Sequence, residues 1–115
     1  MDRESVLKEL ALNLKADRVD DKSMTGTLDG ESVLYYVADG LSIAEIDAIV
    51  SGASVKAIPF FGEGVNSELT DHCTEKLGCY GYYTAYMQGD DLFVSAGIHY
   101  SNADYYDFRT GKRYQ

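Results

Sequence analysis

Two histidines and two cysteines are the residues of this chain that could bind a metal ion or attack a substrate: His72, Cys73, Cys79 and His99. Four such ligands are enough for a zinc site, and a Cys–His pair oriented by Asp71 would be a nucleophile. However, His72 and Cys73 are adjacent on an expected helix, so their side chains point about 100° apart. Cys73 also falls on the apolar stripe of that helix, where a thiol packs as a small apolar group. We therefore expect buried thiols rather than a disulfide, no metal and no cofactor, and we assign no catalytic residue.

The carboxylates are numerous, but no pair stands out as a general acid and base. The chain of 115 residues has 19 acidic and 10 basic side chains, for a net charge of −9. Residues 23–108 contain thirteen acids and only two bases, Lys56 and Lys76. Such a body repels nucleic acid and anionic membranes and is steered toward a basic protein surface. The alternative is that the acidity serves solubility alone.

The clearest structural element is a β-hairpin over Cys79–Tyr100 that turns at Gly89-Asp90, because both halves are rich in aromatic and β-branched residues. Alternation along the first strand places Cys79, Gly81, Tyr83, Ala85 and Met87 on one face, which we expect to pack against helices. Tyr80, Tyr82 and Tyr86 then lie on the far face, near Phe93. Two interpretations stay open: cross-strand aromatic packing, or a binding face, since tyrosine is enriched at interfaces.

Acidic residues near these tyrosines and near the C-terminus complete a candidate partner-binding surface. Asp90 and Asp91 lie in the hairpin turn, and Asp104 and Asp107 flank a second tyrosine pair. The candidate site is therefore Tyr80, Tyr82, Tyr86, Asp90, Asp91, Asp104 and Asp107. An uncovered tyrosine face can also be satisfied by self-association, so a homodimer is a further expectation.

Periodicity and turn residues place the remaining elements. We expect helices over residues 3–16, 42–52 and 66–77, the second with a capping box formed by Ser42 and Glu45. A hairpin over residues 23–38 turns at Asp29-Gly30, a strand covers residues 53–61, and a small hairpin follows residue 104. The expected fold is α+β, a single domain over residues 1–115, with an antiparallel sheet of 4–6 strands and two or three short helices packed on one face.

Size, charge and the lack of a catalytic signature favour a non-enzymatic inhibitor that binds a basic nucleic-acid-binding enzyme, such as a nuclease or CRISPR effector. A phage-type anti-CRISPR or anti-restriction protein would act in this way, by steric block or nucleic-acid mimicry, without binding nucleic acid directly. The alternatives are a toxin-immunity protein that caps a basic nuclease, and a small-ligand-binding or enzymatic α+β domain. With no apolar run long enough to cross a bilayer and no apolar leader, we expect a cytoplasmic location and no membrane partner.

Overall fold

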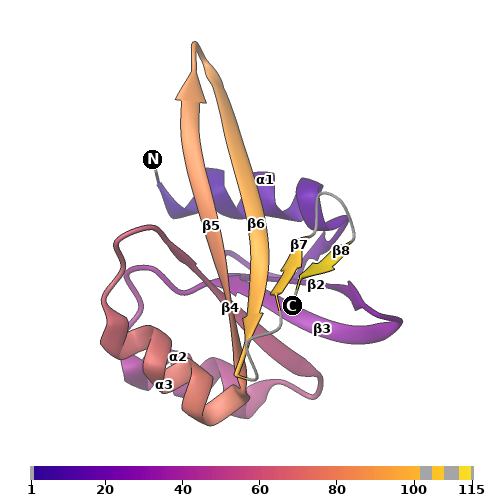
Figure 1. The fold of residues 1–115 in the computed structure, drawn as a ribbon, viewed down its shortest axis with the longest axis vertical. Coiled ribbons are helices and arrows are strands. Elements are labelled where there is room, and N and C mark those ends of the chain that lie inside the picture. Colours follow the sequence, from indigo (N-terminus) through magenta and orange to yellow (C-terminus); the bar gives the residue numbers. More distant parts are fainter. Residues whose placement is uncertain (1, 102–104, 108–111, 115) are drawn as a thin grey trace.

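Three helices and eight strands form the part of the chain that the computed structural model describes, which is residues 2–101, 105–107 and 112–114 (Figure 1). The helices are α1 (Arg3–Leu14), α2 (Ile43–Gly52) and α3 (Ser67–Leu77). The strands are β1 (Asp17–Arg18), β2 (Ser23–Leu28), β3 (Glu31–Val37), β4 (Lys56–Gly62), β5 (Cys79–Gln88), β6 (Asp91–Tyr100), β7 (Tyr105–Asp107) and β8 (Lys112–Tyr114). No helix in these residues is both long and apolar enough to span a membrane.

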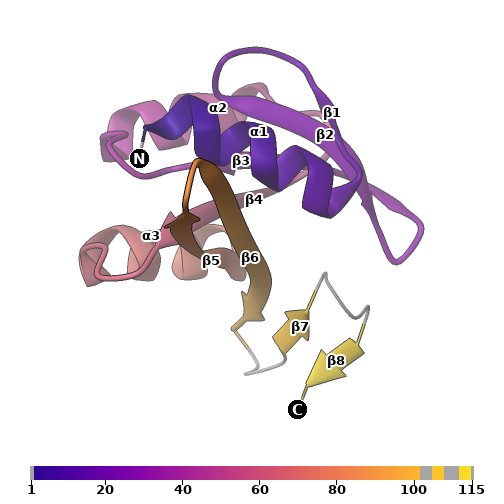
Figure 2. The same ribbon diagram turned by 90° about the horizontal axis from the view of Figure 1, so that it is seen from above.

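The strands form one sheet in which spatial order follows chain order. β3, β4 and β5 are parallel, because α2 and α3 are crossover helices between them, and every other neighbouring pair is antiparallel. The α+β class is confirmed. The expected antiparallel sheet of 4–6 strands is wrong on two counts, since the described residues form eight strands and the sheet is mixed. Figure 2 shows β7 and β8 set apart from the three helices.

Helices cover both faces of the sheet, so the expectation that they pack on one face is also wrong. Side chains of α1, including Leu7 and Leu10, share a core with Tyr35, Phe60 and Ile98 from the sheet. The second core, on the opposite face, combines side chains of α2 and α3 with those of the central strands: Tyr36, Ala38, Leu41, Ile46, Ala57, Phe61 and Cys73. The crossovers through α2 and α3 share one hand, which places both helices on the same face and leaves the other to α1.

Local sequence explains where the helices begin and end. The Asp2 side chain accepts a hydrogen bond from the N–H of Ser5 at 2.8 Å and caps α1. Ser42 and Glu45 form the expected capping box of α2. Gly78, at φ 75°, ends α3 in the left-handed conformation that glycine adopts readily.

The β5–β6 hairpin extends beyond its neighbours, and this feature positions the candidate site. β4 pairs only with residues 81–83 of β5, and β7 pairs only with residues 97–99 of β6. Residues 84–95, which we call the arm, therefore pair only with each other. Figure 1 shows the arm projecting past α1 and the rest of the sheet.

Candidate functional site

Three aromatic side chains line one face of the arm and its base, and we call them the aromatic surface: Tyr82, Tyr86 and Phe93. Tyr86 and Phe93 are cross-strand partners whose rings stack with centroids 5.4 Å apart. They are nevertheless 52% and 41% exposed. The ring of Tyr82, 41% exposed, lies over Gly97 of β6, where a Cβ atom would stand 2.6 Å from the ring. The hairpin therefore presents large aromatic area to solvent.

Tyr80 belongs to the same strand face but is placed differently. Its ring is half-buried and lies 6.2 Å from that of Phe61 and 5.2 Å from that of His99. It packs against the second core under α3. Of the three tyrosines in the candidate site, Tyr80 is thus mainly a packing residue, and Tyr82 and Tyr86 form the accessible part.

The opposite face of the hairpin is covered at its base and open at its tip. Near the base, the hydroxyl of Tyr83 donates to the carboxylate of Asp39, and the side-chain amide of Asn13 in α1 donates to the carbonyl of Val94. At the tip, Met87 is 53% exposed. The arm is therefore apolar on both faces, and its outer part is not covered by a helix.

Acidic side chains lie at the tip of the arm, next to its base and on α3. Asp90 and Asp91 are exposed at the tip, and Glu63, after β4, accepts a hydrogen bond at 3.3 Å from the hydroxyl of Thr84. On α3, three exposed acids follow at helical spacing and form what we call the acidic stripe: Glu68, Asp71 and Glu75. Because Tyr80 packs in the core under α3 and side chains alternate along a strand, the aromatic surface and α3 lie on the same side of the sheet.

Asp107, one of the two C-terminal aspartates of the candidate site, lies on the same sheet face as the aromatic surface, because its cross-strand partner Gly97 is the residue under the Tyr82 ring. Asp107 is half-buried on β7 and pairs in register with Gly97 of β6. Asp104 lies outside the described residues. The acidic stripe, in contrast, was not expected from the sequence, although its spacing of three and four residues on a helix is a readable signal.

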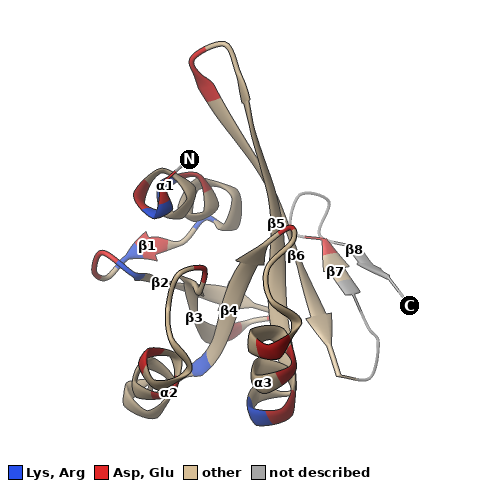
Figure 3. Cartoon of the chain, turned by 90° about the vertical axis from the view of Figure 1, so that its left-hand side faces the viewer, with Lys and Arg blue, Asp and Glu red and all other residues tan. Residues whose placement is uncertain are grey.

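Bases are concentrated on other parts of the molecule. Figure 3 shows acidic residues at the tip of the β5–β6 hairpin and along α3, whose last turn also carries Lys76, and both signs of charge on α1. Arg18 forms a 3.0 Å ion pair with Glu4 of α1, and Lys76 of α3 forms a 2.7 Å pair with Asp47 of α2. From residue 57 to residue 108 the sequence contains eight acids and one base, Lys76. Glu63 and the tip acids Asp90 and Asp91 therefore place negative charge at the two ends of the arm.

The histidines and cysteines occupy packing positions. His72 joins α3 to α2 through a 2.8 Å contact between its Nε2 and Asp47 Oδ1. Cys73 and Cys79 are buried free thiols in the two different cores, on opposite faces of the sheet. Burial raises the pKa of Cys73 to about 11 and raises the pKa of Cys79 as well. Among the described residues, no three His, Cys, Asp or Glu side chains group closely enough to hold a metal ion.

A second polar cluster, at the base of the arm, was not visible in the sequence. The Asp39 carboxylate accepts hydrogen bonds from the hydroxyl of Tyr83 and from the N–H of Gly62, the latter at 2.9 Å. Burial, followed by the bond to Asp39, raises the pKa of Tyr83. The guanidinium of Arg3 donates to the carbonyl of Asp39. This cluster ties α1, β4 and β5 to the end of β3, and so anchors the arm.

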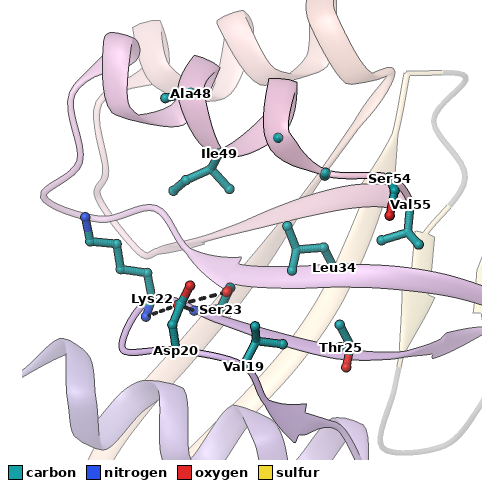
Figure 4. A pocket seen from close by; sticks show the side chains of 12 residues that line it. Val19, Asp20, Lys22, Ser23, Thr25, Leu34, Ala48, Ile49, Ser54 and Val55 are labelled. Carbon is teal, nitrogen blue, oxygen red and sulfur yellow. Dashed lines mark hydrogen bonds between the residues drawn. The ribbon is translucent and has the colours of Figure 1, made fainter.

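A groove of about 390 Å³ lies between α2 and the β1–β2 region (Figure 4). Ile49 of α2 and Leu34 of β3 point into it from two sides, and Val19 forms part of its floor. Asp20, held by hydrogen bonds from the backbone N–H groups of Lys22 and Ser23, provides a polar end. The groove has the size of a small-ligand site.

The chain was compared with protein-family models, curated protein sequences and solved structures, and no match was found in any of the three. The surface of the protein is therefore the guide to its function.

Proposed function

We propose that this protein is a non-enzymatic inhibitor that binds the basic surface of a nucleic-acid-binding enzyme, in the manner of a phage-type anti-CRISPR or anti-restriction protein. The aromatic surface on the projecting arm carries the proposal. Exposed aromatic side chains clustered in this way supply most of the energy at protein interfaces. The same surface would serve a toxin-immunity protein that caps a basic nuclease.

The charge distribution supports a basic partner. Glu63 lies beside Thr84, Asp90 and Asp91 lie at the tip of the arm, and the acidic stripe lies on α3 near the base of β5. Complementary charge raises the association rate and rejects acidic partners. A partner that carries a groove of lysine and arginine for nucleic acid fits this pattern.

The spacing of the acidic stripe supports mimicry of a phosphate backbone. Glu68 and Glu75 are two turns apart, which is about 10 Å along a helix axis. One strand of a DNA duplex presents about three phosphates over that length. Three carboxylates on α3 therefore match the charge density that a nucleic-acid enzyme binds, while the arm would block access by its bulk.

The test begins with the full chain, immobilised through its N-terminus and exposed to native host lysate at about 0.05 M and about 0.5 M salt. We expect recovery of one nucleic-acid-binding enzyme, released at the higher salt, whose activity on nucleic acid is lost when the purified protein is added. Recovery of the chain alone, or of an enzyme that stays active in the complex, would contradict the proposal.

Matched variants identify the surface. Tyr86→Thr with Phe93→Thr should abolish inhibition, and neutralising the acidic stripe with glutamine and asparagine should weaken binding mainly at low salt. The control is Leu12→Thr, which alters an apolar side chain on α1 that is 67% exposed and does not belong to the aromatic surface. If the control weakens inhibition as much as the arm variants do, the aromatic surface is not the binding site.

The groove beside α2 favours a second candidate, a small-ligand-binding domain. Its apolar walls and single polar end would suit a small amphipathic molecule. Displacement of a fluorescent apolar dye, blocked in the variant Ile49→Glu, would support this function. Dye binding that is unchanged in the variant would exclude the groove.

A further inference from the structure

The outer edge of β5 loses its neighbour halfway along the strand. β4 pairs in parallel with residues 81–83 and then turns away after Gly62. From Thr84 to Gln88, β5 pairs with β6 only. In the described part of the chain, the other edge of these five residues therefore has no strand beside it. Such an edge presents backbone N–H and C=O groups that another strand can pair with.

The hairpin turn determines which residues present these groups. The loop Gly89-Asp90 has two residues, of which Gly89 is at φ 63°, as in a type II′ turn. In such a hairpin the flanking residues Gln88 and Asp91 exchange hydrogen bonds, and bonded pairs then alternate along the strands. Ala85 and Met87 therefore direct their N–H and C=O groups away from β6.

Contacts elsewhere in the hairpin agree with this alternation. The same rule turns the carbonyl of Val94 outward on β6, and that carbonyl accepts a hydrogen bond from the side chain of Asn13 in α1. It also turns Gly81 and Tyr83 outward on β5, at the two ends of the segment that pairs with β4. Since α1 reaches the outer edge of β6, the outer edge of β5 is the more open of the two.

The sequence of this edge lacks the usual protection against pairing. Thr84–Gln88 contains no charged residue and no proline, the two features that keep edge strands apart. The charges at its two ends are all negative, Glu63 at the inner end and Asp90 and Asp91 at the tip. A second copy of this chain, with its net charge of −9, would bring like charges together. A basic strand would meet opposite charge at both ends.

We infer that β5 accepts an extended basic segment of a partner protein as an added strand along Thr84–Gln88. The backbone of Ala85 and Met87 would supply the hydrogen bonds, and lysine or arginine side chains of the segment would reach Glu63 and the tip acids. This is strand addition, in which main-chain bonds give affinity and side chains give specificity. The inference rests on the proposed function and specifies the form of the partner's binding segment.

The test uses the full ¹⁵N-labelled chain and a short peptide of alternating lysine and valine with blocked ends. Amide hydrogen exchange is measured by NMR with and without the peptide. We expect exchange at Ala85 and Met87 to slow by about tenfold or more, because these N–H groups gain partners. The N–H of Tyr86, which already bonds to β6, should change little.

Two control peptides and two variants make the result specific. The same peptide N-methylated at its central residues keeps its charge but cannot form the ladder, and a glutamate–valine peptide has the wrong charge. Neither should protect Ala85 or Met87. Met87→Pro removes one outward N–H and no bond to β6, so it should abolish protection at Ala85, whereas Met87→Leu should preserve it.

Unchanged exchange at Ala85 and Met87 with the lysine–valine peptide at millimolar concentration would overturn the inference. If the Tyr82 and Tyr86 ring signals shift while these amides do not, strand addition is wrong but the aromatic surface still binds. Failure of the proposed function has a different signature, which is loss of enzyme recovery or of inhibition in the lysate experiment. The two failures are therefore distinguishable.

Discussion

Tyr86 and Phe93 stack across β5 and β6 with ring planes only 17° from parallel, at a point where the hairpin has left the rest of the sheet. Neither residue belongs to either hydrophobic core. An isolated two-stranded ribbon is marginally stable in water, so a stacked pair of this kind helps to keep the arm extended. The stack therefore serves the shape of the arm more than the stability of the domain.

The first prediction distinguishes a tyrosine that packs against the core, Tyr80, from one that is exposed on the arm, Tyr86. Tyr86→Thr should lower the free energy of unfolding by no more than about 1 kcal/mol, which is the range for a cross-strand pair. Tyr80→Thr should cost roughly 2 kcal/mol, because its ring packs against Phe61 and the second core. Urea unfolding of both variants measures the difference. Equal losses would show that Tyr86 is a packing residue.

The second prediction compares two glycines of the hairpin. A Cβ atom at Gly81 would stand 2.5 Å from the ring of Phe60, which is fully buried and cannot move aside. At Gly97 the Cβ would stand 2.6 Å from the outer end of the Tyr82 ring, which can swing into solvent. Gly81→Ala should therefore cost about 1–3 kcal/mol or more, and Gly97→Ala less than about 1 kcal/mol.

Chemical denaturation measures both costs, and NMR contacts between the Tyr82 ring and residue 97 report the rearrangement. In Gly97→Ala these contacts should weaken and the ring should become more exposed. A large loss of stability in Gly97→Ala with the Tyr82 contacts retained would show that the ring is held more firmly than its exposure suggests.

Much of the local structure could be predicted because its determinants are close in sequence. The capping box of α2 needs only Ser42 and Glu45, three residues apart. The β5–β6 register follows from the turn at Gly89-Asp90 and the alternation on either side of it. The same alternation placed Tyr82, Tyr86 and Phe93 on one face. The structure agrees with these predictions because no distant residue competes with the local signals.

The sheet topology and part of the site depend on distant residues. β4 lies between β3 and β5 because α2 and α3 are crossovers, and alternation of strands with short helices was itself a signal for parallel pairing. The bond between Asp39 and Tyr83 joins residues 44 positions apart, and no local pattern marks it. The acidic stripe could have been found from its helical spacing, whereas its position on the same side of the sheet as the aromatic surface required the fold.

The third prediction concerns the two thiols. Cys73 and Cys79 are buried in different cores on opposite faces of the sheet, and burial raises both pKa values, since it penalises the thiolate. A thiol-specific reagent at pH 8 should react with the folded protein much more slowly than with the protein in guanidinium chloride. Non-reducing electrophoresis after air oxidation should show no internal disulfide. Rapid labelling of the folded chain would contradict their burial.

The fourth prediction concerns Asp47, which joins α2 to α3. Hydrogen bonds from Lys76 and then from His72 lower the pKa of Asp47 in the folded state. A carboxylate whose pKa is lower in the folded state stabilises the protein at pH values above its unfolded pKa of about 3.9. This contribution is lost as the pH falls through the folded pKa. The stability difference between wild type and Asp47→Asn should therefore be present at a pH of about 5 and shrink toward zero at a pH of about 2. Urea unfolding across this range measures it. Asp71→Asn, an exposed change on α3, is the control and should show no such trend. Parallel pH profiles for wild type and Asp47→Asn would mean that the interhelical pair does not contribute to stability.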